Sequence, residues 1–209
     1  MSILDQVLKH KIVAVIRLHD YKYAVETARA LVAGGIPVLE FTLTGQGAID
    51  AVVAARKALG DTVIAGVGTV LQAEEAQAAI TAGAQFVVTP AVRPAVIAAC
   101  VNRDTLSIAG GLTPTELLAA YEAGSQLVKV FPASIGGPRY IKDVLAPLPF
   151  LKLVPTGGVN AETARDFLAA GAVAVGIGGN LVSNRLVAEG AFDQIKAAAE
   201  MCVAALAAN

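Results

Sequence analysis

Lys129 and Glu40 are charged residues that interrupt short apolar runs, where an unpaired charge costs several kcal/mol to bury. Lys129 lies within Leu127–Phe131, and Glu40 lies within Val38–Leu43. An apolar pocket disfavours the ammonium form of a lysine, so a neutral amine becomes available to attack a ketone and form a Schiff base. A nearby carboxylate then carries protons for carbinolamine dehydration and carbon–carbon cleavage. The two residues therefore predict carbonyl chemistry that needs no metal ion.

These charges also have plainer interpretations. A buried Glu40–Lys129 ion pair would set strand register and do nothing else. Arg17, which ends the first apolar run, suits a substrate carboxylate, but a surface salt bridge to Asp20 would explain it equally well. Lys152 starts another run, and its long stem lets the ammonium group reach solvent. We therefore assign Lys152 no chemical role.

The alternation of side chains along a strand indicates which way the two charges point. If Lys129 and Glu40 faced a surrounding helix layer, each charge would be buried among apolar side chains without a partner. If both face the interior of the sheet, the outward positions of the two strands are all apolar: Leu39, Phe41, Val128 and Val130. The pattern therefore predicts that both charges point inward.

Glycine-rich turns follow the last two predicted strands. Pro155–Asn160 and Gly176–Asn180 each contain a Gly-Gly pair, and the second leads toward an expected short helix. Glycines let an anion approach backbone N–H groups closely, and such loops commonly hold a phosphate. A third turn, Gly66–Thr69, is predicted to close the third strand and to place the Thr69 hydroxyl over a carboxylate.

Short β-branched runs alternate with Ala-rich stretches whose apolar residues recur at helical spacing. The predicted strands are Ile12–Ile16, Val38–Leu43, Thr62–Ala65, Phe86–Thr89, Leu106–Ile108, Leu127–Phe131, Leu151–Val154 and Ala172–Gly176. The predicted helices include Tyr23–Val32, Ala48–Ala58, Ala73–Ala82, Ala161–Ala170 and Phe192–Ala207. Ala-Gly pairs at 33–34, 82–83, 123–124 and 170–171 end helices before strands, where glycine accepts a left-handed cap.

This alternation predicts an α/β fold with a parallel sheet. Eight strand–helix units favour a single-domain (β/α)8 TIM barrel over residues 1–209, smaller than the usual size of about 250 residues. The rival is an open doubly wound sheet, for which a glycine-rich turn is expected after the first strand. Arg17–Asp20 contains no glycine, so the barrel is favoured. The catalytic groups are then expected at the carboxyl ends of the strands.

Composition excludes several classes of function. Sixteen Lys and Arg against seventeen Asp and Glu give a net charge of −1, which argues against a nucleic-acid partner or an anionic membrane. No uncharged apolar run approaches the twenty residues of a membrane span. Two distant cysteines and no secretory signal indicate the cytoplasm. Two histidines, His10 and His19, make a His-rich metal site or a Ser-His-Asp triad improbable.

The whole chain resembles the bacterial 2-keto-3-deoxy-6-phosphogluconate (KDPG) aldolases, which overlap in activity with 4-hydroxy-2-oxoglutarate (KHG) aldolases. The matching motifs, in order, are Lys11–Arg17, Val38–Leu43, Gly66–Leu71, Gly111–Leu117, Val128–Pro132 and Pro155–Val159. The resemblance implies a class I aldolase with a (β/α)8 barrel and no cofactor. It also implies a homotrimer that cleaves its sugar acid to pyruvate and glyceraldehyde 3-phosphate.

The resemblance also implies a role for each matching position. Lys129 would form the Schiff base, and Glu40 would be the general acid/base that acts through a water molecule. Arg17 and Thr69 would hold the pyruvyl carboxylate. The other implied substrate contacts are Pro90 and Phe131 as walls of the pyruvyl pocket, Thr156 on the substrate chain, the backbone of Gly157, Gly158, Gly178 and Gly179 on the phosphate, and Asn180 after the last glycine pair.

Two departures from the family pattern leave the aldehyde half of the substrate open. Many members carry an arginine where this chain has Thr44, and a serine where it has Asn180. Sister enzymes that act on the galactonate epimer share the pattern of Phe131–Lys142, and an unphosphorylated KHG is a further alternative. Outside the aldolases, a phosphate-binding isomerase or epimerase would use an acid/base pair, and a non-catalytic sugar-phosphate binder would release no pyruvate.

Overall fold

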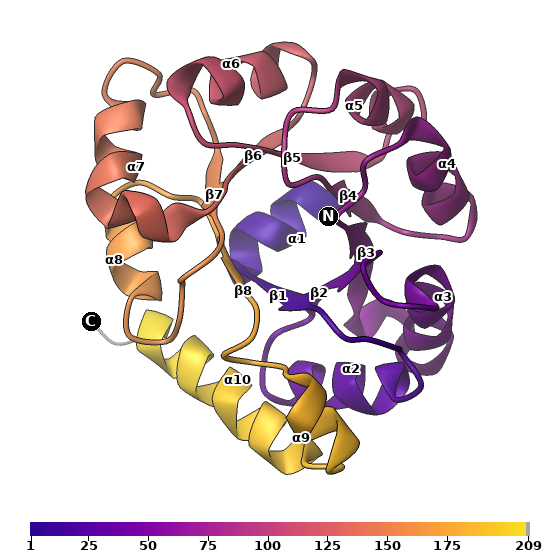
Figure 1. Cartoon of the computed structure of the whole chain (residues 1–209). Coiled ribbons are helices and arrows are strands. Elements are labelled where there is room, and N and C mark those ends of the chain that lie inside the picture. Colours follow the sequence, from indigo (N-terminus) through magenta and orange to yellow (C-terminus); the bar gives the residue numbers. More distant parts are fainter. Residues whose placement is uncertain (208–209) are drawn as a thin grey trace.

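The computed structural model describes residues 1–207, which form a closed barrel of eight parallel strands (Figure 1). The strands are β1 (Ile12–Ile16), β2 (Val38–Thr42), β3 (Ile64–Gly68), β4 (Phe86–Val88), β5 (Leu106–Gly111), β6 (Leu127–Val130), β7 (Leu153–Pro155) and β8 (Val175–Ile177). Strands β1 to β7 pair in chain order, and β8 pairs with β1. A parallel bridge between Thr156 and Gly176, and a 3.0 Å bond from Val173 N–H to the Leu153 carbonyl, close the ring. The predicted (β/α)8 barrel is confirmed.

Helices surround the ring and cover its outer face (Figure 1). They are α2 (Ala24–Ala33), α3 (Ala48–Leu59), α4 (Ala73–Thr81), α5 (Pro94–Val101), α6 (Pro114–Glu122), α7 (Gly137–Leu145), α8 (Ala164–Ala169), α9 (Asn184–Ala188) and α10 (Phe192–Ala207), with short 3₁₀ turns at Gly60–Thr62 and Ala133–Ile135. No helix within residues 1–207 combines the length and the apolar character needed to cross a membrane.

One further helix, α1 (Ile3–His10), packs against the inner core of the barrel and lies across the centre of the ring in Figure 1. It begins with a capping box, in which the Ser2 hydroxyl accepts a 3.1 Å bond from the Asp5 N–H. It ends where Lys11 adopts a left-handed conformation with φ of 60°. Its Val7 side chain is fully buried with the inner core. The sequence analysis did not predict this helix.

The apolar side chains form two layers, one between the strands and the helices and one inside the barrel. Leu39, Phe41, Val128 and Val130 belong to the outer layer. Val38 and Leu127, which precede the two charged residues by two positions, belong to the inner layer. The predicted inward orientation of Glu40 and Lys129 is therefore confirmed, because side chains two residues apart share a face.

Two local predictions need correction. Strand β3 runs to Gly68 rather than stopping at Ala65, because Gly66 and Gly68 stay in the ladder with β2 and are not part of a turn. The expected left-handed glycines occur at 83, 124 and 171, with φ of 103°, 102° and 106°. The pair Ala33–Gly34 differs. Helix α2 ends at Ala33 and Gly34 is its C-cap, so the left-handed conformation falls one residue later, on Gly35 with φ of 91°.

Candidate active site

Glycines occupy inward positions in the carboxyl-terminal half of the barrel, where side chains from neighbouring strands need the space. A Cβ on Gly68 would lie 2.6 Å from Glu40 Cγ, and one on Gly66 would lie 2.6 Å from the ring of Phe86. A Cβ on Gly176 would lie 2.9 Å from Thr156 Cγ2. Real Cβ atoms do not approach so closely, so the missing side chains make room for Glu40 and Thr156.

Glu40 extends from the middle of β2 into this space and is only 2% exposed. Its Oε1 atom has no hydrogen-bond partner within residues 1–207. Burial raises the pKa of Glu40 above its ordinary 4.5, and the positive charges of Lys129 and Arg17 partly oppose that rise. A buried carboxyl group with a raised pKa and a free oxygen can exchange a proton with a bound substrate or water.

Lys129 lies in the middle of β6, is 4% exposed, and pairs in register with Gly110 on one side and Val154 on the other. Its Nζ atom lies over the ring of Phe131, 4.9 Å from the centroid. In the described part of the chain, the ion pairs within 4.0 Å do not include Glu40 with Lys129. The structure therefore does not show the direct ion pair that was the plainer interpretation of these charges.

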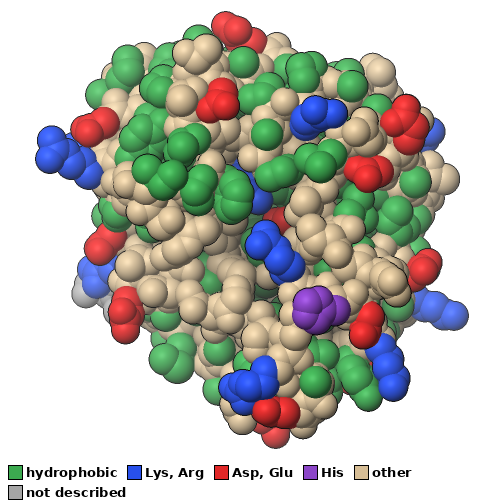
Figure 2. Space-filling view, viewed as in Figure 1, with side chains coloured by type: hydrophobic (Ala, Val, Ile, Leu, Met, Phe, Trp, Pro, Cys, Tyr) green, Lys and Arg blue, Asp and Glu red, His purple; other side chains and the backbone are tan. Residues whose placement is uncertain are grey.

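A cavity of about 330 Å³ opens at the carboxyl ends of β1, β7 and β8. It brings together many of the predicted site residues: Arg17, Phe131, Thr156, Gly157, Gly158, Gly178, Gly179 and Asn180. Val15, Val159, Val182, Ser183 and Asn184 complete its lining. Basic and acidic side chains meet over the centre of the ring on this face (Figure 2). Lys129 and Glu40 are not among the lining residues. Phe131 connects the cavity to Lys129, because it lines the cavity and its ring centroid lies 4.9 Å from the Lys129 Nζ atom.

The two glycine turns line this cavity and have backbone N–H groups without a hydrogen-bond partner in the described part of the chain. Within residues 1–207, no hydrogen bond takes up the backbone N–H of Gly157, Gly158, Val159, Gly179 or Asn180. Gly157 and Gly158 have φ of 91° and 79°, a conformation that side-chain-bearing residues rarely adopt. Convergent N–H groups beside a guanidinium bind anions.

Thr69 and Pro90 lie outside the lining of that cavity. Thr69 directly follows β3, is half-buried, and has a positive φ of 59°, which is uncommon for a threonine. Pro90 follows β4 and packs so closely on β5 that a Cβ on Gly110 would overlap its backbone. The two residues lie on the β3–β4 side of the barrel mouth, whereas Arg17 lies with the glycine turns on the β1–β8 side.

Three further residues singled out in the sequence are Arg17, Lys152 and Asn180. Arg17 is exposed and forms no ion pair with Asp20, whose carboxylate instead accepts the Lys22 N–H at 3.0 Å. Lys152 is exposed, as expected. Asn180 lines the cavity, and its side-chain amide donates to the Val159 carbonyl at 3.4 Å.

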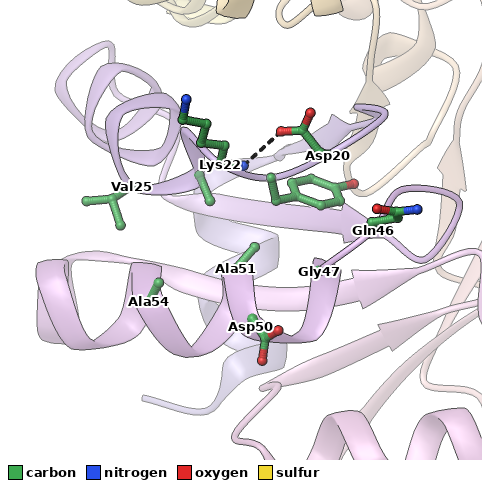
Figure 3. Close-up of a pocket in the computed structure, with 10 residues that line it drawn as sticks. Asp20, Lys22, Val25, Gln46, Gly47, Asp50, Ala51 and Ala54 are labelled. Carbon is green, nitrogen blue, oxygen red and sulfur yellow. Dashed lines mark hydrogen bonds between the residues drawn. The ribbon is translucent and has the colours of Figure 1, made fainter.

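A depression of about 460 Å³ lies outside the barrel between α2 and α3. Asp20, Lys22, Gln46 and Asp50 supply its polar lining. Lys22 and Asp50 point in opposite directions, so the charges do not converge on a common point (Figure 3). It is therefore a poorer candidate than the barrel mouth.

Sequence reasoning missed Tyr21, a buried tyrosine whose hydroxyl contacts the ends of both β1 and β2. The available signal was an aromatic residue within the polar segment after the first strand. A tyrosine there can bury its ring and still satisfy its hydroxyl with strand-end carbonyls.

Comparison with known proteins identifies the family. A sequence model of the family described as KDPG and KHG aldolase matches residues 3–198. The 2-dehydro-3-deoxy-phosphogluconate aldolase of Treponema pallidum is 35% identical over 198 residues, 94% of each chain. The 2-dehydro-3-deoxy-6-phosphogalactonate aldolase of Escherichia coli is 33% identical over 83% of this chain and 85% of its own.

A solved structure agrees with these relatives. The KDPG aldolase of Legionella pneumophila, with pyruvate captured as a covalent carbinolamine intermediate, matches at a TM-score of 0.85 and 28% identity. The match covers 95% of this chain and 96% of that one. The chain described above therefore belongs to the KDPG and KHG aldolase family.

Proposed function

We propose that Lys129 is the Schiff-base lysine of this class I aldolase, and that Glu40 is its general acid/base. The substrate is a 2-keto-3-deoxy sugar acid phosphate, foremost 2-dehydro-3-deoxy-6-phosphogluconate, cleaved to pyruvate and glyceraldehyde 3-phosphate. The observation that carries the proposal is the inward pair itself, an amine and a carboxyl group 4% and 2% exposed beside a cavity at the barrel mouth. A protein that only binds ligands has no use for a desolvated amine.

The chemistry follows from the two groups. The neutral amine of Lys129 attacks the C2 ketone, and loss of water from the carbinolamine gives an iminium ion. Glu40, through a water molecule at its unpartnered Oε1, takes the proton of the C4 hydroxyl. The C3–C4 bond then breaks, the aldehyde leaves, and the bonding electrons form an enamine. Glu40 then gives its proton to C3 of the enamine, and hydrolysis of the resulting iminium releases pyruvate and restores the amine.

The phosphate is proposed to bind the N–H groups of the turns after β7 and β8. Arg17 lines the same cavity as these turns, so we assign it to the anionic end of the substrate held there. The family resemblance assigns Arg17 to the pyruvyl carboxylate, but its place in the lining of the cavity that Gly158 and Gly179 also line supports the phosphate instead. Thr69 stays proposed for the carboxylate.

Borohydride reduction in the presence of pyruvate tests the mechanism. The expected result is a pyruvate-derived mass on the peptide that contains Lys129, with full turnover retained in EDTA. The Lys129→Met variant should lose both labelling and turnover. Lys152→Met is the matched control, because this exposed lysine at the amino end of β7 should leave both unchanged. Wild-type protein that stays unlabelled would refute the Schiff base.

Pyruvate release from three substrates tests the aldehyde half. We expect fastest turnover with the gluconate-derived phosphate, slower turnover with the galactonate epimer, and weak turnover with KHG, which lacks the phosphate. The Arg17→Met variant should raise KM for the phosphates by about tenfold, the loss of roughly one charge-assisted hydrogen bond, and should hardly change KM for KHG. Equal effects on all three substrates would return Arg17 to the carboxylate.

We also propose a homotrimer that works in the cytoplasm. The exposed aromatic rings of Tyr121 and Phe150 lie 5.0 Å apart, an apolar surface of the kind that subunit contacts cover. Cys100 and Cys202 are free and buried, which suits a reducing compartment. Light scattering on the purified protein measures the subunit number, and a monomer would contradict the proposal.

A further inference from the structure

We propose that Tyr21 is a positioning residue whose hydroxyl fixes the distance between the carboxyl ends of β1 and β2. The first of these ends directly precedes Arg17, and the second lies two residues after Glu40. The inference rests on the proposed function, because it assigns Tyr21 to the support of those two groups. Tyr21 does not line the cavity at the barrel mouth and acts through its neighbours.

The hydroxyl of Tyr21 lies at a junction of two strands. Its oxygen is 2.8 Å from the carbonyl of Ile16, the last residue of β1, and 2.9 Å from the carbonyl of Thr42, the last residue of β2. Ile16 directly precedes Arg17, and Thr42 lies two residues after Glu40 on the same face of the strand. The Tyr21 hydroxyl therefore contacts the backbone within two residues of both Arg17 and Glu40.

The ring of Tyr21 has little freedom to move. Its side chain is buried, and it packs edge-on against Phe41 with centroids 5.6 Å apart. On another side a Cβ on Gly45 would lie 2.9 Å from Tyr21 Cε2, so only a glycine lets the loop after β2 close over the ring. A phenol held in this way is a rigid spacer.

A hydroxyl chain extends the junction to the surface. Thr42 Oγ1 lies 3.3 Å from the Tyr21 hydroxyl and 2.8 Å from Thr44 Oγ1. The loops after β1 and β2 also meet where the Gln46 N–H donates to the His19 carbonyl at 3.0 Å. The two loops are therefore linked at two places, and the Tyr21 hydroxyl is the link nearer the strand ends.

The position of the Glu40 carboxyl group depends on this junction. Among the residues that the structure describes, Glu40 Oε1 has no hydrogen-bond partner to orient it, so the course of β2 and the packing over Gly68 decide where its oxygens lie. Proton transfer requires heavy atoms within about 3 Å, and small displacements of a reacting group reduce rates steeply. Loss of the Tyr21 hydroxyl should therefore lower the rate of Glu40-dependent steps. The fraction of Lys129, across the barrel on β6, that forms a Schiff base at equilibrium should stay unchanged, because a slower proton carrier alters the rate of a step and not its equilibrium.

The Tyr21→Phe variant tests the inference, with Tyr140→Phe as matched control. Tyr140 also donates its hydroxyl to a backbone carbonyl at the barrel mouth, that of Leu112, but on the β5 side away from Arg17 and Glu40. Three quantities are measured on the full-length protein: the fraction trapped by borohydride with pyruvate, kcat per trapped site, and the exchange of pyruvate methyl protons with D₂O. The exchange reports proton transfer to the enamine without any aldehyde.

For Tyr21→Phe we expect an unchanged trapped fraction and a loss of about tenfold in both kcat and proton exchange, the rate equivalent of about one hydrogen bond. The KM of the phosphorylated substrate should rise as well, because Arg17 shares the junction. Tyr140→Phe should lose as much thermal stability as Tyr21→Phe but keep kcat and proton exchange within about twofold of wild type.

Two results would overturn the inference. If Tyr21→Phe retains wild-type kcat and exchange per trapped site, the hydroxyl serves stability alone. If Tyr140→Phe is slowed equally, the effect is general loosening of the barrel mouth. A wild-type protein that borohydride and pyruvate do not label would instead refute the proposed Schiff base, so the two failures are distinguishable.

Discussion

The two halves of the barrel interior differ sharply although the same strands build both. At the amino-terminal half the inward side chains are bulky and apolar, as with Val38, Ile64, Phe86 and Leu127, and α1 packs against them. One step further along β2, β3, β6 and β8 the inward position holds a charge or no side chain: Glu40, Gly66, Lys129 and Gly176. A spacing of only two residues along a strand therefore separates the apolar layer that stabilises the fold from the positions that can take part in chemistry.

The difference has a physical cause. A closed barrel needs a filled interior, because apolar burial and close packing supply most of its stability. The amino-terminal half meets that need, so the carboxyl-terminal half tolerates a desolvated carboxyl group and glycines in strands. Five predictions at four sites test this division, with the sites taken in order of expected effect.

Glu40→Gln should have the largest effect. It keeps the shape of the side chain but removes the proton acceptor, so kcat should fall by about a thousandfold. Steady-state pyruvate release measures this, and borohydride labelling of Lys129 should persist. A kcat within tenfold of wild type would mean that another group moves the proton.

The same variant should be more stable than wild type at neutral pH. Because burial raises the pKa of Glu40 above 4.5, the folded state holds its proton more tightly than the unfolded chain. The stability that this provides is present below pH 4.5 and is lost as the pH rises through the raised pKa. Glu40→Gln should therefore gain about 1–2 kcal/mol in urea unfolding at pH 7.5 and nothing near pH 4. An equal gain at both pH values would contradict this origin.

Gly68→Ala should have the next largest effect. The added methyl group would overlap the carboxyl group of Glu40 and displace it, so kcat should fall by about a hundredfold. A double-mutant cycle isolates the cause. In a Glu40→Ala background the same glycine change should cost almost nothing, and a full additional loss there would show that the methyl group disturbs something else.

Val7→Ala changes the packed half instead. Val7 is fully buried where α1 meets the inner core, so the free energy of unfolding should fall by about 2 kcal/mol. Activity at 25 °C should be unchanged, because the carboxyl-terminal half is untouched. Urea unfolding and kcat are measured side by side. A large fall in kcat with folding intact would show that the halves are coupled.

The smallest effect is expected at Cys100, a buried nucleophile whose surroundings differ from those of Lys129. It lies in the outer apolar layer, where burial raises the pKa of its thiol to about 11, whereas Lys129 lies beside a cavity. At pH 8 we expect Cys100 to resist iodoacetamide in the folded protein and to react at a normal rate in urea, as mass spectrometry of its peptide would show. Rapid labelling of the native protein would mean that the outer layer opens easily.

The sequence predicted most of the architecture because its signals are local. Eight apolar runs set the strands, and charges at Glu40 and Lys129 fixed which face is inward. Local sequence patterns predicted the wrong element where a glycine fits both a turn and a strand. Gly66 and Gly68 looked like a turn and lie in β3, since only the neighbouring Glu40 and Phe86 side chains explain glycines in a strand. Helix α1 was not predicted because it packs against the inner core of the barrel, and the sequence alone does not show where that core lies.

For this protein, the sequence alone determined the barrel, the inward amine and carboxyl group, and the two glycine turns, because periodicity and the cost of burying charge act along the chain. Tertiary structure alone decided that Arg17 lies with those turns, that Glu40 rests over Gly68 without an ion pair to Lys129, and that Tyr21 joins β1 to β2. These are contacts between residues distant in sequence, set by how eight strands close into a ring.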